Sequence, residues 1–188
     1  MPRRRFIFDP PDRFVAGTIG TPGRRTFFLQ ARDGRRVVSV VLEKVQVAVL
    51  ADRLGQLLGE LERRGVTRPA EVAPNGDAAP LDEPLNEAFR AGALTLGWDG
   101  DAERILIEAR AQAEDEEDPD QIADMEVDDD DEEGPDLFRV RMTAPVAHAF
   151  VDRAVRVVSS GRPPCPLCGQ PLDATGHICP RRNGHYVN

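Results

Sequence analysis

The stretch from Arg36 to Leu61, RVVSVVLEKVQVAVLADRLGQLLGEL, contains the transition on which the predicted fold depends. Its first seven residues are rich in valine and predict a β-strand. Leucines then recur three and four residues apart, at positions 50, 54, 57, 58 and 61, so that they share one face of a helix. The stretch therefore predicts a strand followed by a helix over about 44–64, which Gly65 is suited to cap.

Two more strands are expected before this unit, over 14–19 and 24–31. A turn, Gly20-Thr21-Pro22-Gly23, separates them, and Asp33-Gly34 separates the second from the third. An Asp-Gly pair between two β-rich runs is the strongest short-range signal for a hairpin. The first part of the chain therefore predicts a three-stranded antiparallel meander followed by a helix.

The second part of the chain repeats this order after a proline-rich linker over 68–84. Strands are expected over 93–98, 104–111 and 137–143, and a helix over about 144–160. Laid over the first part at an offset of 100 residues, Val140 matches Val40 and Asp152-Arg153 matches Asp52-Arg53. We therefore predict an α+β fold in which two pseudo-repeated antiparallel sheet-then-helix units form one domain over 1–161. The core-facing side of the second helix is expected to carry Val146, Phe150, Ala154 and Val157.

The charge of the chain is unevenly distributed. Its formal net charge is −9, yet residues 114–133 hold 14 acids and no base, so the remainder carries about −9 + 14 = +5. Fourteen like charges in twenty residues repel one another and bury little apolar surface. We expect a disordered acidic loop over 114–135 within a mildly basic protein.

The last two dozen residues have the spacing of a metal site. They contain all three cysteines, in Cys165-Pro-Leu-Cys168 and Cys179, together with His177 and His185. A Cys-x2-Cys turn supplies two of the four ligands of a tetrahedral zinc ion, and Cys179 supplies a third. Ligand spacing leaves His177 and His185 open as the fourth. We expect a zinc-ribbon-like tail over 162–188 that holds a structural Zn2+.

Several segments of the chain resemble a known family. They are Asp9-Pro10-Pro11-Asp12-Arg13-Phe14, the stretch 22–31 (PGRRTFFLQA), Val41-Leu42-Glu43-Lys44 and the Cys-Pro-Leu-Cys tail. Together they resemble domain-of-unknown-function family 3090, an uncharacterised actinobacterial family. Its tail pattern, Gly-His-x-Cys-Pro, matches Gly176 to Pro180, and the resemblance therefore implies Cys165, Cys168, His177 and Cys179 as the zinc ligands, with His185 in reserve.

The sequence lacks three motifs: the nucleophile elbow, the dinucleotide-binding fingerprint and the complete zinc-deaminase motif. None of the three serines lies in a Gly-x-Ser-x-Gly elbow, and the glycines at 17, 20 and 23 have the wrong spacing for a dinucleotide fingerprint. Zinc deaminases need a His-x-Glu upstream of Pro-Cys-x2-Cys, whereas His148 is followed by Ala149-Phe150. No catalytic or cofactor-binding residue is therefore proposed from the sequence, apart from the zinc ligands.

Two hypotheses about function follow. The first is a non-enzymatic interaction or adaptor protein whose partners are other proteins. The second is a small-molecule-binding protein or enzyme with a pocket near Asp12, Arg13, Arg25 and Trp98. Nucleic-acid binding by the basic remainder is a third and weaker hypothesis, because the arginine-rich turns carry few interleaved aromatic residues.

The expected compartment is the cytoplasm, and no membrane partner is expected. The apolar run after Arg3–Arg5 is too short for the core of a signal peptide, and no window approaches 18 apolar residues. An odd number of cysteines clustered in a Cys-x2-Cys tail favours metal binding over disulfides.

Overall fold

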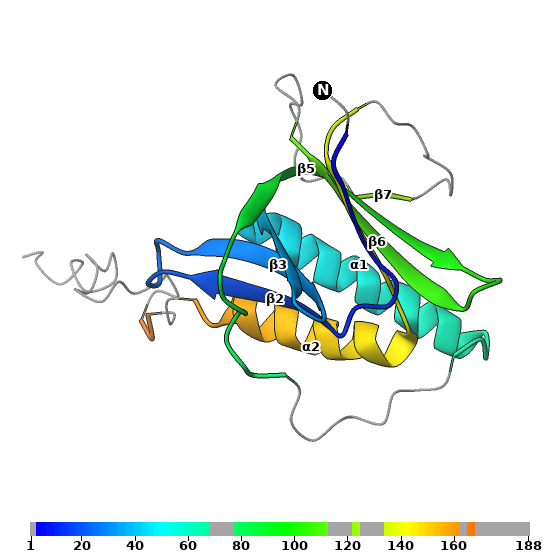
Figure 1. Ribbon diagram of the computed structural model, residues 1–188. Coiled ribbons are helices and arrows are strands. Elements are labelled where there is room, and N and C mark those ends of the chain that lie inside the picture. The colour runs from blue at the N-terminus through cyan, green and yellow to red at the C-terminus, as the bar shows by residue number, and fades with distance from the viewer. Residues whose placement is uncertain (1–2, 68–76, 113–121, 125–133, 162–164, 168–188) are drawn as a thin grey trace, which may run out of the picture.

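The computed structural model describes residues 3–67, 77–112, 122–124, 134–161 and 165–167. In these ranges two helices pack on one side of a curved sheet (Figure 1). The elements follow one another as β1 (Arg5–Phe8), β2 (Arg13–Ile19), β3 (Thr26–Asp33), β4 (Arg36–Leu42), α1 (Lys44–Arg63), β5 (Glu87–Asp99), β6 (Arg104–Ala111), β7 (Ile122–Asp124), β8 (Leu137–Met142) and α2 (Ala144–Ser159).

Strands β2, β3 and β4 form the predicted antiparallel meander. The turn between β3 and β4 contains Gly34 at φ +56°, a backbone conformation that glycine adopts without strain. The backbone N–H of Gly34 donates to a carboxylate oxygen of Asp12 at 2.7 Å, which fixes the turn against the start of β2. The Asp-Gly signal therefore predicted the correct hairpin.

The whole sheet is mixed, whereas the sequence predicted antiparallel units only. Its order is β1-β8-β6-β5-β4-β3-β2, and β7 pairs with β5 outside this path. The contacts β4–β5, β1–β8 and β5–β7 are parallel. These pairings join strands far apart in the chain, and no turn signal announces them. The α+β class is confirmed, and the prediction of exclusively antiparallel pairing was wrong.

The order of elements recurs in the two parts of the chain. Strands β2, β3 and β4 lead into α1, and β5, β6 and β8 lead into α2. The recurrence includes the parallel contacts, because the first residues of β5 pair with β4 just as β1 pairs with β8. β1 and β2 together thus take the place that the single long strand β5 takes in the second part.

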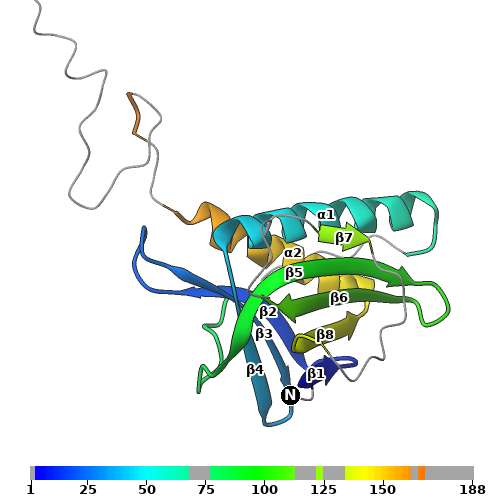
Figure 2. The ribbon, with the colours of Figure 1, turned by 90° about the horizontal axis from the view of Figure 1, so that it is seen from above.

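Strand β5 bends as it leaves β4 and joins β6 (Figure 2). The register shifts between Ala91 and Ala93, where β5 is irregular. The buried amide of Gln46 donates to the carbonyl oxygens of Ala91 and Gly92 at 3.3 and 3.1 Å. Its amide oxygen accepts the N–H of Glu43 at 2.9 Å, as part of a capping box at the start of α1. Gln46 therefore fastens the first turn of α1 to the bend in β5.

The core lies between the sheet and the two helices. Leu50, Leu54, Leu58 and Leu61 of α1 are buried as predicted, and Leu57 packs partly buried beside them. In α2 the prediction was wrong for Val146, which is 37% exposed. The buried face of α2 instead consists of Ala144, Ala147, Phe150, Arg153 and Ala154.

Four phenylalanines connect the two parts of the chain within this core. The rings of Phe14 in β2 and Phe150 in α2 stack with centroids 4.6 Å apart. Phe138 in β8 contacts both Phe14 and Phe8, at centroid distances of 6.3 and 5.8 Å. Since each pair joins a strand from the start of the chain to an element near its end, the two parts share one core.

Candidate functional site

The two helices run antiparallel and contact each other along their length (Figure 2). Near the start of α1, a Cβ placed on Gly161 would lie 3.5 Å from Lys44 Nζ. Near its end, His148 Nε2 of α2 lies 2.9 Å from a carboxylate oxygen of Glu62. The start of α1 therefore lies beside the end of α2.

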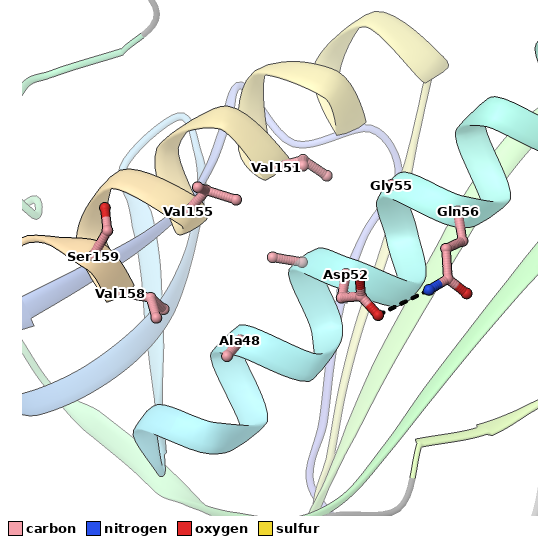
Figure 3. Close-up of a pocket in the computed structure, with 9 residues that line it drawn as sticks. Ala48, Asp52, Gly55, Gln56, Val151, Val155, Val158 and Ser159 are labelled. Atoms are coloured by element: carbon pink, nitrogen blue, oxygen red, sulfur yellow. Dashed lines mark hydrogen bonds between the residues drawn. The ribbon is translucent and has the colours of Figure 1, made fainter.

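A groove of about 560 Å³ follows the line between the helices (Figure 3). Three valines of α2, Val151, Val155 and Val158, approach α1 across it. Val155 is 53% exposed, although it is apolar and lies within α2. The other residues that line the groove are Ser159 of α2 and Ala48, Ala51, Asp52, Gly55 and Gln56 of α1.

The hollow results from small side chains on α1. At the offset of 100 residues that relates the helices, Ala51 corresponds to Val151 and Gly55 to Val155. A Cβ on Gly55 would approach Val151 Cγ1 only to 3.9 Å, and a Cβ on Gly59 would meet nothing within 4 Å. Across the groove, the valines of α2 lie opposite alanine and glycine residues of α1, and these small side chains leave space between the two helices.

The polar groups of the groove are few and already paired with one another. The amide of Gln56 donates to the Asp52 carboxylate at 2.8 Å, as Figure 3 shows. Ser159 donates its hydroxyl to the carbonyl of Arg156 at 3.2 Å. Most of the lining is apolar, so it is suited to bury apolar side chains.

At one end the groove passes into a second, more polar pocket of about 460 Å³. The two share Val158 and Ser159, and the second pocket adds the basic side chains of Arg25 and Lys44. Arg25 donates from one guanidinium nitrogen to the carbonyl and hydroxyl oxygens of Ser160, at 2.8 and 3.0 Å. It thereby caps the last turn of α2. The depression is thus apolar along the helices and positively charged at the start of α1.

The residues of the sequence-predicted pocket do not come together. Arg13 and Arg25 lie near opposite ends of the β2–β3 hairpin, because Arg13 pairs with Arg32, which is seven residue steps or about 23 Å from Arg25. Asp12 holds the β3–β4 turn, and Trp98 packs partly buried against the core near the end of β5. Of the four, Arg25 alone lies beside the groove described above, so the prediction of one pocket formed by all four was wrong.

Arg13 instead holds an extended segment, residues 77–86, which we call the strap. It donates two hydrogen bonds to Asp77, at 2.5 and 3.0 Å, and one to Asp82 at 2.8 Å. The hydrogen bonds from Arg13 lower the pKa of Asp77 below its ordinary value, although burial acts in the opposite direction. Buried Arg153 of α2 donates to the carbonyl oxygens of Ala16, Asp77 and Ala79, and so ties the strap to edge strand β2. This cluster is explained by its structural role.

Only the first of the predicted zinc ligands falls within the described residues. Cys165 is 6% exposed and lies shortly after the end of α2. Cys168, His177, Cys179 and the reserve ligand His185 lie outside the described residues. Among the residues that are described, no group of three or more His, Cys, Asp or Glu side chains is arranged to hold a metal ion. The zinc site therefore stays a prediction.

The sequence did contain a signal for the groove. Gly55, which lines the groove, lies inside a 20-residue helix, where a glycine disfavours the helix by about 1 kcal/mol relative to alanine. Val155 lies outside the buried face of α2. A glycine inside α1 and an exposed valine on the facing side of α2 together indicate an apolar groove between the helices.

Comparison with known proteins gives a family and no function. A family model described as "Protein of unknown function (DUF3090)" matches residues 6–179. No curated protein and no solved structure matches the chain. Among the described helices, none is long and apolar enough to cross a membrane.

Proposed function

The chain belongs to the DUF3090 family of proteins of unknown function, and we propose that it is a non-enzymatic adaptor that binds a helix of a partner protein in the groove between α1 and α2. The observation that carries this proposal is the open apolar groove, with its exposed valines on α2 and its small residues on α1. An amphipathic helix that lies in such a groove buries its apolar face there and keeps its polar face in water.

The shape of the groove favours a helix over a small molecule. Ligand pockets surround most of the surface of a small molecule, whereas this groove is lined by two helices and no described element lies over it (Figure 3). Its lining on α1 runs from Ala48 to Gln56, a rise of about 12 Å, which matches two turns of a partner helix.

Site-specific photo-crosslinking tests the adaptor proposal. A photoreactive phenylalanine analogue at position 155, in the full chain and in the cells that produce it, should yield a defined crosslinked protein. The crosslinked peptide should carry apolar residues three and four positions apart. The matched control places the same analogue at Asp152, which is exposed on α2 and does not line the groove.

A second variant makes the test specific for the groove. Gly55→Leu adds a side chain that fills the groove, and it should abolish the crosslink from position 155. The adaptor proposal fails if positions 152 and 155 capture the same proteins, or if Gly55→Leu leaves the crosslink unchanged.

We also propose that the tail holds one structural Zn2+ through Cys165, Cys168, His177 and Cys179. The support is the ligand spacing and the family's Gly-His-x-Cys-Pro pattern. Purified full-length protein should contain about one zinc per chain by elemental analysis, and Cys168→Ser should lose it. His177→Ala should lower the zinc content and His185→Ala should not; the reverse result would assign His185 as the fourth ligand.

A further inference from the structure

The groove and the basic pocket beside it form one continuous depression. Its charge, together with its apolar lining, specifies the chemistry of the partner. The groove and the basic pocket share Val158 and Ser159, and their combined lining along α1 extends from Lys44 to Gln56. Twelve residue steps of a helix rise about 18 Å, so a partner segment of about three turns spans both.

The end of the depression at Lys44 is electropositive. Both charged residues that line the second pocket, Arg25 and Lys44, are basic. The nearby carboxylate of Glu43 is engaged by Arg90 at 2.6 Å and by the capping box of α1. The helix ends contribute little net field, because the positive start of α1 lies beside the negative end of α2.

Lys44 lies between the two helix ends. It occupies the first position of α1, directly after the N-cap residue Glu43, and its Nζ would lie 3.5 Å from a Cβ on Gly161, just after α2. It is also the one lysine among the 24 basic residues of the chain. Its ammonium group lines the second pocket together with the guanidinium of Arg25, and an acidic group bound there would face both charges.

We propose that the partner helix is acidic at one end, and that its carboxylates bind against Lys44 and Arg25 while its apolar face fills the groove. This inference rests on the proposed function and specifies the chemistry of the partner. Acidic residues are favoured in the first turn of a helix, so the acidic end is the N-terminal end. The partner helix then runs in the same direction as α1.

Two peptide probes test the inference. Both are 16-residue fluorescein-labelled helices with the same face of leucine and alanine, held helical by a side-chain lactam; one begins with three glutamates and the other with three lysines. Fluorescence anisotropy with the full-length protein should show that the acidic probe binds at least fivefold more tightly at low salt. The difference should shrink at 0.5 M NaCl, where surface charges are screened.

Charge reversal gives the decisive comparison. Lys44→Glu should abolish the preference, because the new glutamate offsets the remaining charge of Arg25, so that the two probes bind this variant about equally. Lys44 is chosen because Arg25 also caps α2. The matched control is Arg53→Glu, which makes the same charge change on an exposed position of α1 outside the lining, and it should keep the wild-type preference.

The outcomes separate the two proposals. If wild type binds both probes equally well, and Gly55→Leu or Val155→Gln abolishes the binding of both, the groove binds a helix and the inference of an acidic end is overturned. If neither probe binds wild type more tightly than it binds Gly55→Leu, the proposed function falls as well. If sedimentation shows a dimer that Gly55→Leu dissociates, a second copy occupies the groove and the inference is overturned. Circular dichroism of each variant checks that α1 and α2 are intact.

Discussion

At the scale of single residues, the glycines of α1 differ in what they do. Gly59 has helical backbone angles, and a Cβ there would meet nothing within 4 Å. Gly65 follows the end of α1 at φ +70°, and its N–H donates to the carbonyl of Glu62 at 2.9 Å. The first glycine has no steric reason to be glycine, whereas the second adopts a left-handed conformation that other residues avoid.

These two positions predict opposite effects of the same substitution. Gly59→Ala should raise the free energy of unfolding by about 0.5–1 kcal/mol, because alanine favours the helix and restricts the unfolded chain. Gly65→Ala should lower it by about 1 kcal/mol, because a side chain disfavours the left-handed conformation. Urea denaturation of both variants measures the difference. Destabilisation by Gly59→Ala would mean that the hollow face of α1 is closely packed against something.

A buried carboxylate in the sheet gives a second prediction at this scale. Glu108 in β6 is fully buried, and its side chain contacts that of Arg139 in neighbouring β8. Arg139→Met should therefore cost about 3–5 kcal/mol of stability, because it leaves a buried charge without its main partner.

The double variant Glu108→Leu/Arg139→Met provides the control. Replacing both members of a buried ion pair by apolar residues is often nearly neutral. A double-mutant cycle by chemical denaturation should therefore show strong coupling between the two positions. If the single and double variants were equally destabilised, the pair would not be the source of the effect.

At the scale of elements, the strap depends on one carboxylate whose pKa is lowered, that of Asp77. The hydrogen bonds of Arg13 hold the pKa of Asp77 below its ordinary value of 3.8. A carboxyl group whose pKa is lower in the folded state stabilises that state above the unfolded pKa, and this contribution is lost as the pH falls through the folded pKa. The strap should therefore be firmly held at neutral pH and should loosen below about pH 4.

Leu81 reports on this change, because it packs over Gly17 of β2. A Cβ on Gly17 would lie only 2.5 Å from a methyl carbon of Leu81. The methyl resonances of Leu81 should move towards their unfolded positions in acid, and Asp77→Asn should produce the same change at pH 7. Glu60→Gln is the control: Glu60 also has a lowered pKa, from a hydrogen bond to Arg64, but it lies on α1 away from the strap. Resonances that stay unchanged in Asp77→Asn at pH 7 would show that the strap does not depend on the Asp77 carboxylate.

Local signals in the sequence account for most of the elements. Turn residues and valine runs located β2, β3 and β4, and the helix predicted over about 44–64 agrees with α1 at its start and to within one residue at its end. The missed strands are those whose pairing is parallel and distant. The run Phe6-Ile7-Phe8 is too short to announce β1, and β7 lies within an acidic segment whose composition favours no strand.

The candidate site depends even more on information that the sequence holds only indirectly. Asp152-Arg153 matched Asp52-Arg53 in the repeat, and nothing in this pattern indicated that Arg153 is buried. Its side chain is 6% exposed and donates to three carbonyl oxygens of other segments. The groove exists because glycine and alanine on α1 face valine on α2, a relation between helices that are 100 residues apart. Such a relation becomes visible only when the antiparallel packing of the helices is known.

At the scale of the whole molecule, the two parts of the chain differ most in one connection. Strands β3 and β4 are joined by two residues, whereas their counterparts β6 and β8 are joined by residues 112–136. This longer connection contains the 14 acidic residues of the stretch 114–133. It leaves and re-enters the sheet at one place, because the N–H of Ala111 donates to the carbonyl of Asp136 at 2.8 Å. The acidic segment thus stands where a hairpin turn would suffice.

Replacement of residues 112–135 by Asn-Gly should therefore give a folded protein. The two residues would join Ala111 to Asp136 as Gly34-Arg35 join Asp33 to Arg36, and they would keep the ion pair between Arg4 and Asp136.

Shortening the connection from 24 residues to two removes about 2 kcal/mol of loop-closure cost, which offsets the loss of the three-residue pairing between β7 and β5. The free energy of unfolding in urea should be equal or higher, and the groove should bind the acidic peptide probe as before, since α1 and α2 are unchanged. A molten or aggregated product would mean that the acidic segment is part of the fold; an intact fold that no longer binds the probe would mean that the segment takes part in recognition.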